Sequence, residues 1–139
     1  MMLRRDTLSL ADARAIAHHV VEGARARRFA VCVAVTDTTT FAQCHLRMDG
    51  APLFAAQGAL EKSASASEGG KPTTYYDAML KAGRTSVLRL PHTVGPGGVP
   101  IIVGGSCVGA VGVSGAPPHI DIELAEAAVA AFVSRHSDK

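Results

Sequence analysis

The sequence is poor in aromatic residues, with no tryptophan, two tyrosines and four phenylalanines among its 139 residues. Its core must therefore be built from small aliphatic side chains, which allow helices to pack closely onto a sheet. Apolar residues make up 47% of the chain and charged residues 19%, a balance that argues against intrinsic disorder. This length and composition predict one folded domain spanning residues 1–139.

Cysteine is also scarce, and the three that occur, Cys32, Cys44 and Cys107, lie far apart in the sequence. This odd number without close pairs argues against a disulfide framework and against a zinc site of the CxxC type. Cys32 and Cys107 lie in apolar runs, so we expect both to be small buried hydrophobic residues. The sequence shows neither a signal-peptide pattern nor an apolar run long enough to span a membrane. A cytoplasmic protein without a membrane partner is therefore expected.

The positive charges do not form a nucleic-acid interface. The formal net charge is +2, and the arginines cluster around the first predicted helix while acidic residues recur through the rest of the chain. Binding to nucleic acid usually needs a concentrated basic face with polar or aromatic readers. A solvated helix face accounts for the arginines, and we expect no nucleic-acid partner.

Hydrophobic periodicity and turn residues predict helices alternating with hairpins. The expected helices cover about 10–27, 52–67, 73–82 and the segment after Pro118; the expected strands cover 29–37, 41–48, 99–103 and 107–114. Proline and glycine make residues 85–98 a loop for much of their length. Hairpins joined by helices are typical of a mainly antiparallel sheet with helices packed on its faces.

Several short motifs follow one another in a fixed order. They are Val35-Thr-Asp37, Arg47-Met-Asp-Gly-Ala51, Glu61-Lys62, Gly70-Lys-Pro-Thr73, Pro96-Gly-Gly-Val-Pro100 and Val108-Gly-Ala-Val-Gly-Val-Ser-Gly115. Together they resemble the GlcG/HbpS-like family over about residues 8–133. The sequence departs from the family pattern at Asp37-Thr-Thr-Thr40, where Asp-x-Gly-Gly is usual, and at Cys44-His45.

The resemblance implies an α/β (α+β) domain of the profilin-like, three-layer α/β/α type, with a mainly antiparallel sheet of about five strands. It also implies assembly into homo-oligomers and, for some members, haem binding. Because one fold can serve many functions, the resemblance does not establish the chemistry of this chain. A small domain with little aromatic core also gains stability by burying surface between subunits, so we expect a homo-oligomer.

The charged residues of the motifs are Asp37, Arg47, Asp49 and Lys62. Two carboxylates and two cations at one edge of the sheet could bind a small anionic ligand and shift the pKa of Lys62 or Asp37. A structural ion pair between Arg47 and Asp37, fixing the strand ends, explains the same residues. Both interpretations remain open at this point.

The glycine-rich motifs offer backbone groups to a ligand. Gly97, Gly98 and Val99 could present free N–H groups to a carboxylate or propionate, although a plain turn explains them more simply. Gly112 and Ser114 indicate either a backbone-lined pocket wall or close packing.

Histidines supply the remaining candidate groups. His18 and His19 are adjacent on the first helix, so they point about 100° apart and cannot both ligate one metal. Either could be an axial haem ligand, or both could simply be exposed helix residues. His45 shares a strand face with Arg47 and Asp49, and His92 lies in the Pro/Gly loop.

Three functions are therefore compatible with the sequence. The chain could bind haem or a related tetrapyrrole, with an axial histidine and with Arg or Lys meeting the propionates. It could instead be a cofactor-independent enzyme acting on a small anionic molecule by isomerisation, decarboxylation or ring chemistry. The proton-exchanging residues would then be Asp37, Lys62, His45 and His92. It could also be an accessory subunit without chemistry of its own.

Overall fold

The computed structural model describes residues 1–136 and shows an α+β domain of four α-helices, one 3-10 helix and one antiparallel sheet. The elements are α1 (Leu10–Ala26), β1 (Cys32–Asp37), β2 (Ala42–Arg47), α2 (Phe54–Gly69), α3 (Thr73–Lys81), η1 (Thr85–Arg89), β3 (Gly98–Val103), β4 (Ser106–Ser114) and α4 (Pro118–His136). This order matches the order expected from the sequence, except for η1, which falls in a segment expected to be loop.

The sheet has four strands in the order β2-β1-β4-β3, and every neighbouring pair is antiparallel. The expectation of about five strands is therefore wrong for the described residues. The two hairpins supply all four strands, whereas the segment between α2 and β3 folds into α3, η1 and a loop instead of a further strand.

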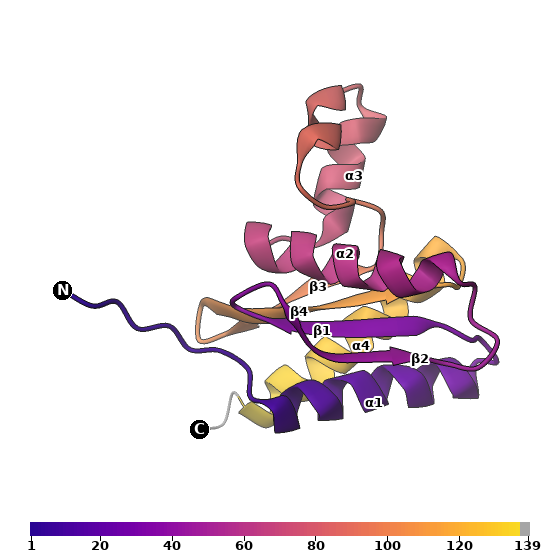
Figure 1. The fold of residues 1–139 in the computed structure, drawn as a ribbon, viewed down its shortest axis with the longest axis horizontal. Helices are drawn as coiled ribbons and strands as arrows, with labels where there is room; N and C mark the ends of the chain where they lie inside the picture. The colour runs from indigo at the N-terminus through magenta and orange to yellow at the C-terminus, as the bar shows by residue number, and fades with distance from the viewer. Residues whose placement is uncertain (137–139) are drawn as a thin grey trace.

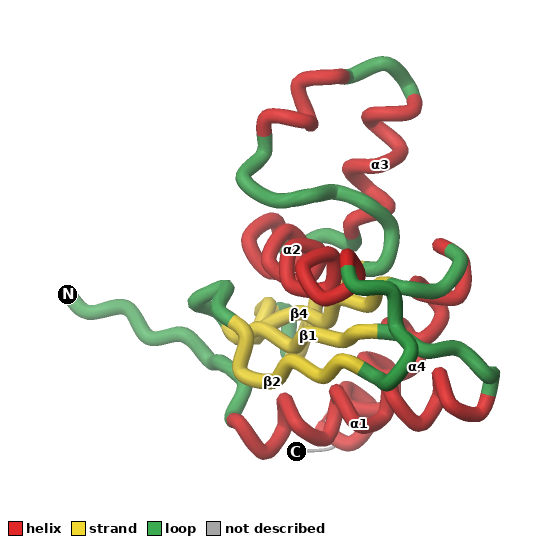
Figure 2. The backbone as a smooth tube through the Cα atoms, turned by 45° about the vertical axis from the view of Figure 1, so that its right-hand side comes forward, coloured by secondary structure: helices red, strands yellow, loops and turns green. Residues whose placement is uncertain are grey.

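The helices cover the two faces of the sheet in three layers, with α1 and α4 on one side and α2 on the other (Figure 1; Figure 2). Alternation along β1 sorts its side chains between these layers. Val33 and Val35 join Ile16 of α1 in the larger core, while Ala34 packs with Ala59 of α2 in a second, smaller cluster.

Helix α1 begins as its sequence predicts. The Ser9 hydroxyl caps the helix by accepting a hydrogen bond from the Asp12 amide at 3.1 Å. The face that carries Ile16, Ala17 and Val20 is fully buried. This apolar face holds α1 beneath the sheet and leaves its polar residues in solvent.

Helix α2 lies so close to the sheet that glycine is required at the contact. A Cβ atom at Gly112 of β4 would lie 2.6 Å from the Ser63 amide nitrogen and closer still to the Ala59 carbonyl oxygen. At Gly98 of β3, a Cβ atom would lie 2.7 Å from the Thr73 methyl group and would collide with the Lys62 carbonyl. The backbone of α2 therefore rests almost directly on β3 and β4.

Helices α3 and η1 form a projection that stands away from the three layers (Figure 1). Among residues 73–89, those buried are Thr73 at the start of α3 and Val87 in η1. The chain returns to the sheet through the Pro/Gly loop before β3. None of the helices within residues 1–136 has the length and hydropathy needed to cross a bilayer.

The close approach of α2 makes a quantitative prediction. Gly112→Ala should lower the free energy of unfolding by about 1–3 kcal/mol, because the new methyl group must push α2 away from β4. Gly95→Ala is the matched control, since its Cβ atom would make only ordinary contacts, the nearest at 3.7 Å. Urea unfolding followed by circular dichroism measures both variants. Equal stability of the two would show that α2 is not held against the sheet in this way.

Candidate functional site

The expected cluster of Asp37, Arg47 and Asp49 does not form, because the strands that carry these residues run in opposite directions. In the β1–β2 hairpin, Cys32 pairs with Arg47, so Arg47 lies five residues along β1 from Asp37. At about 3.3 Å per residue, this places the two residues at opposite ends of the strand. The interpretation as an Arg47–Asp37 ion pair is therefore wrong, and so is the placement of these motifs at one edge.

Asp37 is engaged in local structure at its own end of the sheet. Its carboxylate accepts a hydrogen bond from the Thr39 amide at 2.8 Å, and its backbone carbonyl accepts one from the Ser67 hydroxyl at 3.1 Å. The first bond stabilises the β1–β2 turn, and the second connects that turn to the last turn of α2.

Lys62 reaches from α2 past the end of the sheet to Asp121 at the start of α4. Its Nζ lies 3.5 Å from Asp121 Oδ2 and donates to the Val113 carbonyl at 2.9 Å. The other Asp121 oxygen accepts from the Ala116 amide at 3.1 Å. Only 11% of the Lys62 side chain and 4% of the Asp121 side chain are exposed. The pair therefore joins helices on opposite faces of the sheet. No motif in the sequence indicated that Asp121 takes part.

Burial changes the titration of both members of this pair. Desolvation raises the pKa of Asp121 from 3.8 to about 6, although the neighbouring Lys62 charge and the backbone hydrogen bonds act in the opposite direction. Desolvation likewise lowers the pKa of Lys62, against the attraction of Asp121. For both groups, loss of water outweighs the ion pair, as is common for charges removed from solvent.

The glycine-rich motifs contribute to packing around this pair. Gly97 adopts φ +126°, and a Cβ atom there would lie 3.2 Å from Lys62 Nζ and collide with the Val113 carbonyl. The Gly98 amide donates to the Thr73 hydroxyl at 2.9 Å, so it is not free for a ligand. Val99 packs partly buried against the larger core.

Gly112 and Ser114 both lie under α2. Gly112 lies against the α2 backbone at Ala59 and Ser63. Ser114 faces Gly58 of α2, where a Cβ atom would come within 2.8 Å of the Ser114 hydroxyl. Of the two interpretations that the sequence left open, close packing accounts for these positions.

The four residues considered for acid–base chemistry lie in separate places. His45 is exposed on the edge strand β2, opposite Ala34. His92 Nε2 lies 3.2 Å from Glu68 Oε1, near the last turn of α2. Lys62 is buried with Asp121, and Asp37 lies in the β1–β2 turn. The structure therefore does not bring these four groups together around one substrate.

A hollow of about 540 Å³ lies between α1 and the end of β2. It does bring together three of the residues selected from the sequence, His18, Arg47 and Asp49, all of them exposed. The other lining residues are Val21, Glu22, Arg25, Leu46 and Met48. His19, on a different side of α1, is not part of the lining. An imidazole, apolar side chains and guanidinium groups thus share one open surface.

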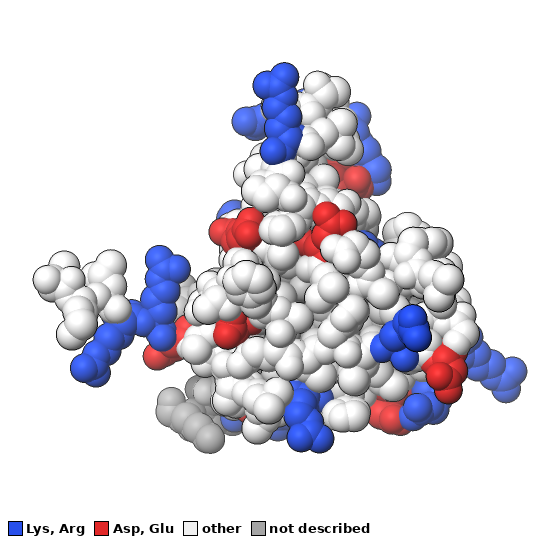
Figure 3. Space-filling view, viewed as in Figure 1, with Lys and Arg blue, Asp and Glu red and all other residues white. Residues whose placement is uncertain are grey.

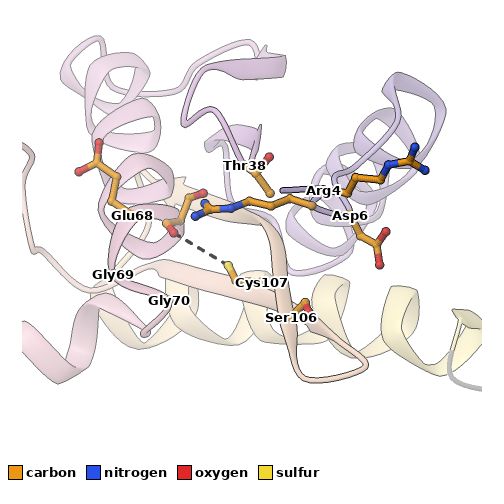
Figure 4. Close-up of a pocket in the computed structure, with 10 residues that line it drawn as sticks. Arg4, Asp6, Thr38, Glu68, Gly69, Gly70, Ser106 and Cys107 are labelled. Atoms are coloured by element: carbon orange, nitrogen blue, oxygen red, sulfur yellow. Dashed lines mark hydrogen bonds between the residues drawn. The ribbon is translucent and has the colours of Figure 1, made fainter. Parts of the chain in front are cut away.

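A second hollow, of about 460 Å³, lies between the N-terminal arm, the end of α2 and the β3–β4 hairpin (Figure 4). Cys107, expected to be buried, is only half-buried and borders this hollow beside Arg4 and Arg5. Its thiol faces the Ser67 and Gly109 carbonyls, at 3.9 and 3.3 Å. No residue selected from the sequence as a site lies here. Across the described chain, no three His, Cys, Asp or Glu side chains cluster in a way that could hold a metal ion.

Comparison with known proteins gives consistent results. Residues 8–130 match the family described as haem degrading protein HbpS-like. Protein GlcG of Escherichia coli K12 is 36% identical over 94 residues, which cover 67% of this chain and 70% of GlcG.

Several solved structures of other proteins are similar to this structure over nearly the whole chain. Klebsiella pneumoniae protein ORFY superposes with a TM-score of 0.89 at 27% identity, covering 94% of each chain. A double mutant of Streptomyces reticuli HbpS gives 0.86 at 28% identity, covering 94% of this chain and 90% of that protein. A PduOC–haem complex gives 0.82 at 25% identity, with coverage of 90% and 94%.

The Lys62–Asp121 pair predicts an unusual titration. The Asp121 carboxyl should titrate with a midpoint of about 6, measurable from its carboxyl ¹³C chemical shift. The pKa of Asp121 in the folded state lies above the ordinary value of 3.8, so the protonated carboxyl favours the folded state. This contribution to stability is fully present below pH 3.8 and is lost as the pH rises through about 6. Lys62→Met should raise the midpoint further by removing the positive charge.

Lys81→Met is the control, because Lys81 pairs with Asp77 on the exposed surface of α3 and should leave Asp121 unaffected. An ordinary midpoint in the parent protein, or one unmoved by Lys62→Met, would contradict the buried pair.

Proposed function

The chain belongs to the HbpS-like family, and on that premise we propose that it binds haem or a related tetrapyrrole in the hollow between α1 and β2. The observation that carries the proposal is the meeting of His18, Arg47 and an apolar wall in that hollow. Its volume of about 540 Å³ falls within the roughly 300–1,000 Å³ typical of small-molecule sites. The haem in the PduOC complex adds support from a relative.

His18 is the proposed axial ligand. Imidazole is a common ligand of haem iron, and His18 is an exposed side chain on a rigid helix. Met48 borders the same hollow, but its sulfur already accepts a hydrogen bond from the Val31 amide at 3.5 Å. His19 lies outside the lining of the hollow, so His18 is favoured over its neighbour.

Arg47 is the proposed partner for a propionate. Arg25 also borders the hollow, but its guanidinium pairs with Glu22 one turn earlier on α1. Arg47 makes no ion pair within 4.0 Å among residues 1–136, so its charge remains available to a carboxylate. A guanidinium suits this role because its donors match the two oxygens of a carboxylate.

The remaining lining residues would bind the macrocycle itself. Val21 and Leu46 offer apolar surface from α1 and β2, and burial of that surface against a porphyrin face is favourable. Bound haem would supply redox chemistry at its iron, while these residues hold and orient it. The dispersal of Asp37, Lys62, His45 and His92 favours this binding function over the acid–base enzyme that the sequence left open.

Replacement of His18 tests the assignment of the axial ligand. The parent protein should bind one hemin per chain with a sharpened Soret band, and His18→Ala should weaken binding by more than about tenfold, since even the hydrogen-bond partners of metal ligands contribute that much. His19→Ala is the matched control and should bind as the parent does. Spectra identical in both variants and the parent would exclude α1 as the source of the ligand.

Replacement of Arg47 tests the propionate contact separately. Arg47→Ala should weaken hemin binding by about two- to fivefold, the size expected of an exposed ion pair, and the effect should shrink at high salt. The dimethyl ester of the same porphyrin has no carboxylate charge and should bind parent and variant equally. A loss of the same size with the ester would assign Arg47 a structural role instead.

A further inference from the structure

A small hollow of about 180 Å³ lies where the end of α2 meets α3 and the loop before β3. Its lining includes Glu68 and Gly69 of α2, Tyr76 of α3, and Leu90, Pro91 and His92 of the loop. We call it the His92 hollow. It lies on the α2 side of the sheet, opposite α1, and is therefore separate from the His18 hollow (Figure 1).

Two hydrogen bonds fix the loop and the His92 ring against α2. The Ser65 hydroxyl donates to the Thr93 carbonyl at 2.7 Å, and His92 Nε2 lies 3.2 Å from Glu68 Oε1. An ionised carboxylate can only accept, so Nε2 carries the hydrogen and Nδ1 of the neutral imidazole is an acceptor. Within residues 1–136, Nδ1 has no hydrogen-bond partner. The Glu68 carboxylate thus leaves one ring nitrogen ready to accept from a ligand.

Tyr76 supplies a hydroxyl to the same hollow. A Cβ atom at Gly69 would lie 2.9 Å from Tyr76 Cζ and collide with its hydroxyl, so glycine allows the ring to lie on the end of α2. Desolvation, followed by the neighbouring Tyr75, raises the pKa of Tyr76, so the hydroxyl keeps its proton at neutral pH. This hydroxyl has no hydrogen-bond partner in the described part of the chain. It is therefore free to donate to a ligand.

The charges around the His92 hollow are negative. Glu68 lines it, and Glu61 lines the adjoining hollow of about 440 Å³, which shares Leu90, Pro91 and His92. Neither lining includes a lysine or arginine from residues 1–136. Figure 3 shows acidic side chains where the projection meets the body of the domain. An anionic ligand would be repelled here, whereas a neutral one would not.

The size and walls of the hollow restrict its ligand further. A volume of about 180 Å³ is below the roughly 300–1,000 Å³ of sites for drug-sized molecules, so it suits a molecule with one ring. Leu90, Pro91 and the Tyr76 ring provide apolar walls. One hydroxyl group can donate to His92 Nδ1 and accept from Tyr76 at the same time. A hydroxyl on an aromatic ring is the stronger donor, because its proton is more acidic than that of an aliphatic alcohol.

We propose that the His92 hollow binds a small neutral phenol. The ligand hydroxyl donates to His92 Nδ1 and accepts from the Tyr76 hydroxyl, while the ring packs against Leu90 and Pro91. Glu68 is a positioning residue, because its bond to Nε2 determines which imidazole nitrogen accepts. The inference concerns binding alone and does not depend on haem binding.

Titration of the ¹⁵N-labelled full chain with phenol and with toluene, followed by NMR, tests the ligand class. Toluene has the same shape but no hydroxyl, so phenol should bind about fivefold or more tightly, the effect of two neutral hydrogen bonds. The shifted amides should lie around Gly69, Tyr76 and His92. Benzoate, which is anionic, should bind more weakly than phenol. Toluene binding as tightly as phenol, benzoate binding more tightly, or shifts confined to other regions would each overturn the proposal.

Replacement of each polar partner tests the proposed geometry. His92→Leu and Tyr76→Phe should each reduce the preference for phenol over toluene by about two- to tenfold, the effect of one hydrogen bond. Toluene binding should change little, which shows that the hollow persists in the variants. Tyr75→Phe and His119→Leu are the matched controls, since both residues are exposed and lie outside the lining. They should keep the full preference, as should His18→Ala, which separates this site from the His18 hollow. A preference for phenol that survives both His92→Leu and Tyr76→Phe would overturn the assignment.

Discussion

The close contact between the backbone of α2 and the sheet constrains the rest of the domain. Gly98 and Gly112 permit this contact, and any larger residue at either position would meet the α2 backbone. Because dispersion forces decay steeply with distance, a helix that touches the sheet backbone gains much from small side chains. This explains how a chain with 4% aromatic residues assembles a dense core, with alanines on the α2 side and larger aliphatic residues on the α1 side.

The same contact leaves little room for a ligand between α2 and the sheet. Lys62 must therefore extend past the sheet end, where Asp121 and the Val113 carbonyl receive its amine. The open hollows lie instead at the periphery, among them the one where α1 passes the end of β2.

Much of the fold could be predicted because its signals are local. The Ser9 cap and the spacing of Ile16, Ala17 and Val20 specify α1, and alternation along β1 and β2 specifies a hairpin. The 3-10 helix η1 was less predictable, and the figure of about five strands came from the family resemblance, whereas the residue pattern itself placed the four strands observed. Helix α3 was predicted, but η1 buries only Val87 among its five residues, so no hydrophobic period marks it.

The sequence by itself determined the helices, the hairpins, the family and the set of residues from which a site could be built. It could not determine which of these residues meet, because that depends on strand direction and on contacts distant in sequence. The antiparallel β1–β2 hairpin separates Asp37 from Arg47, while packing of α1 beneath the sheet places His18 along the same hollow as Arg47, 29 positions away. Asp121 meets Lys62 across 59 positions, since α2 and α4 lie on opposite faces of the sheet and the two side chains meet beside the Val113 carbonyl of β4. Which residues lie close together was therefore decided by the tertiary structure alone, through packing that no local sequence pattern encodes.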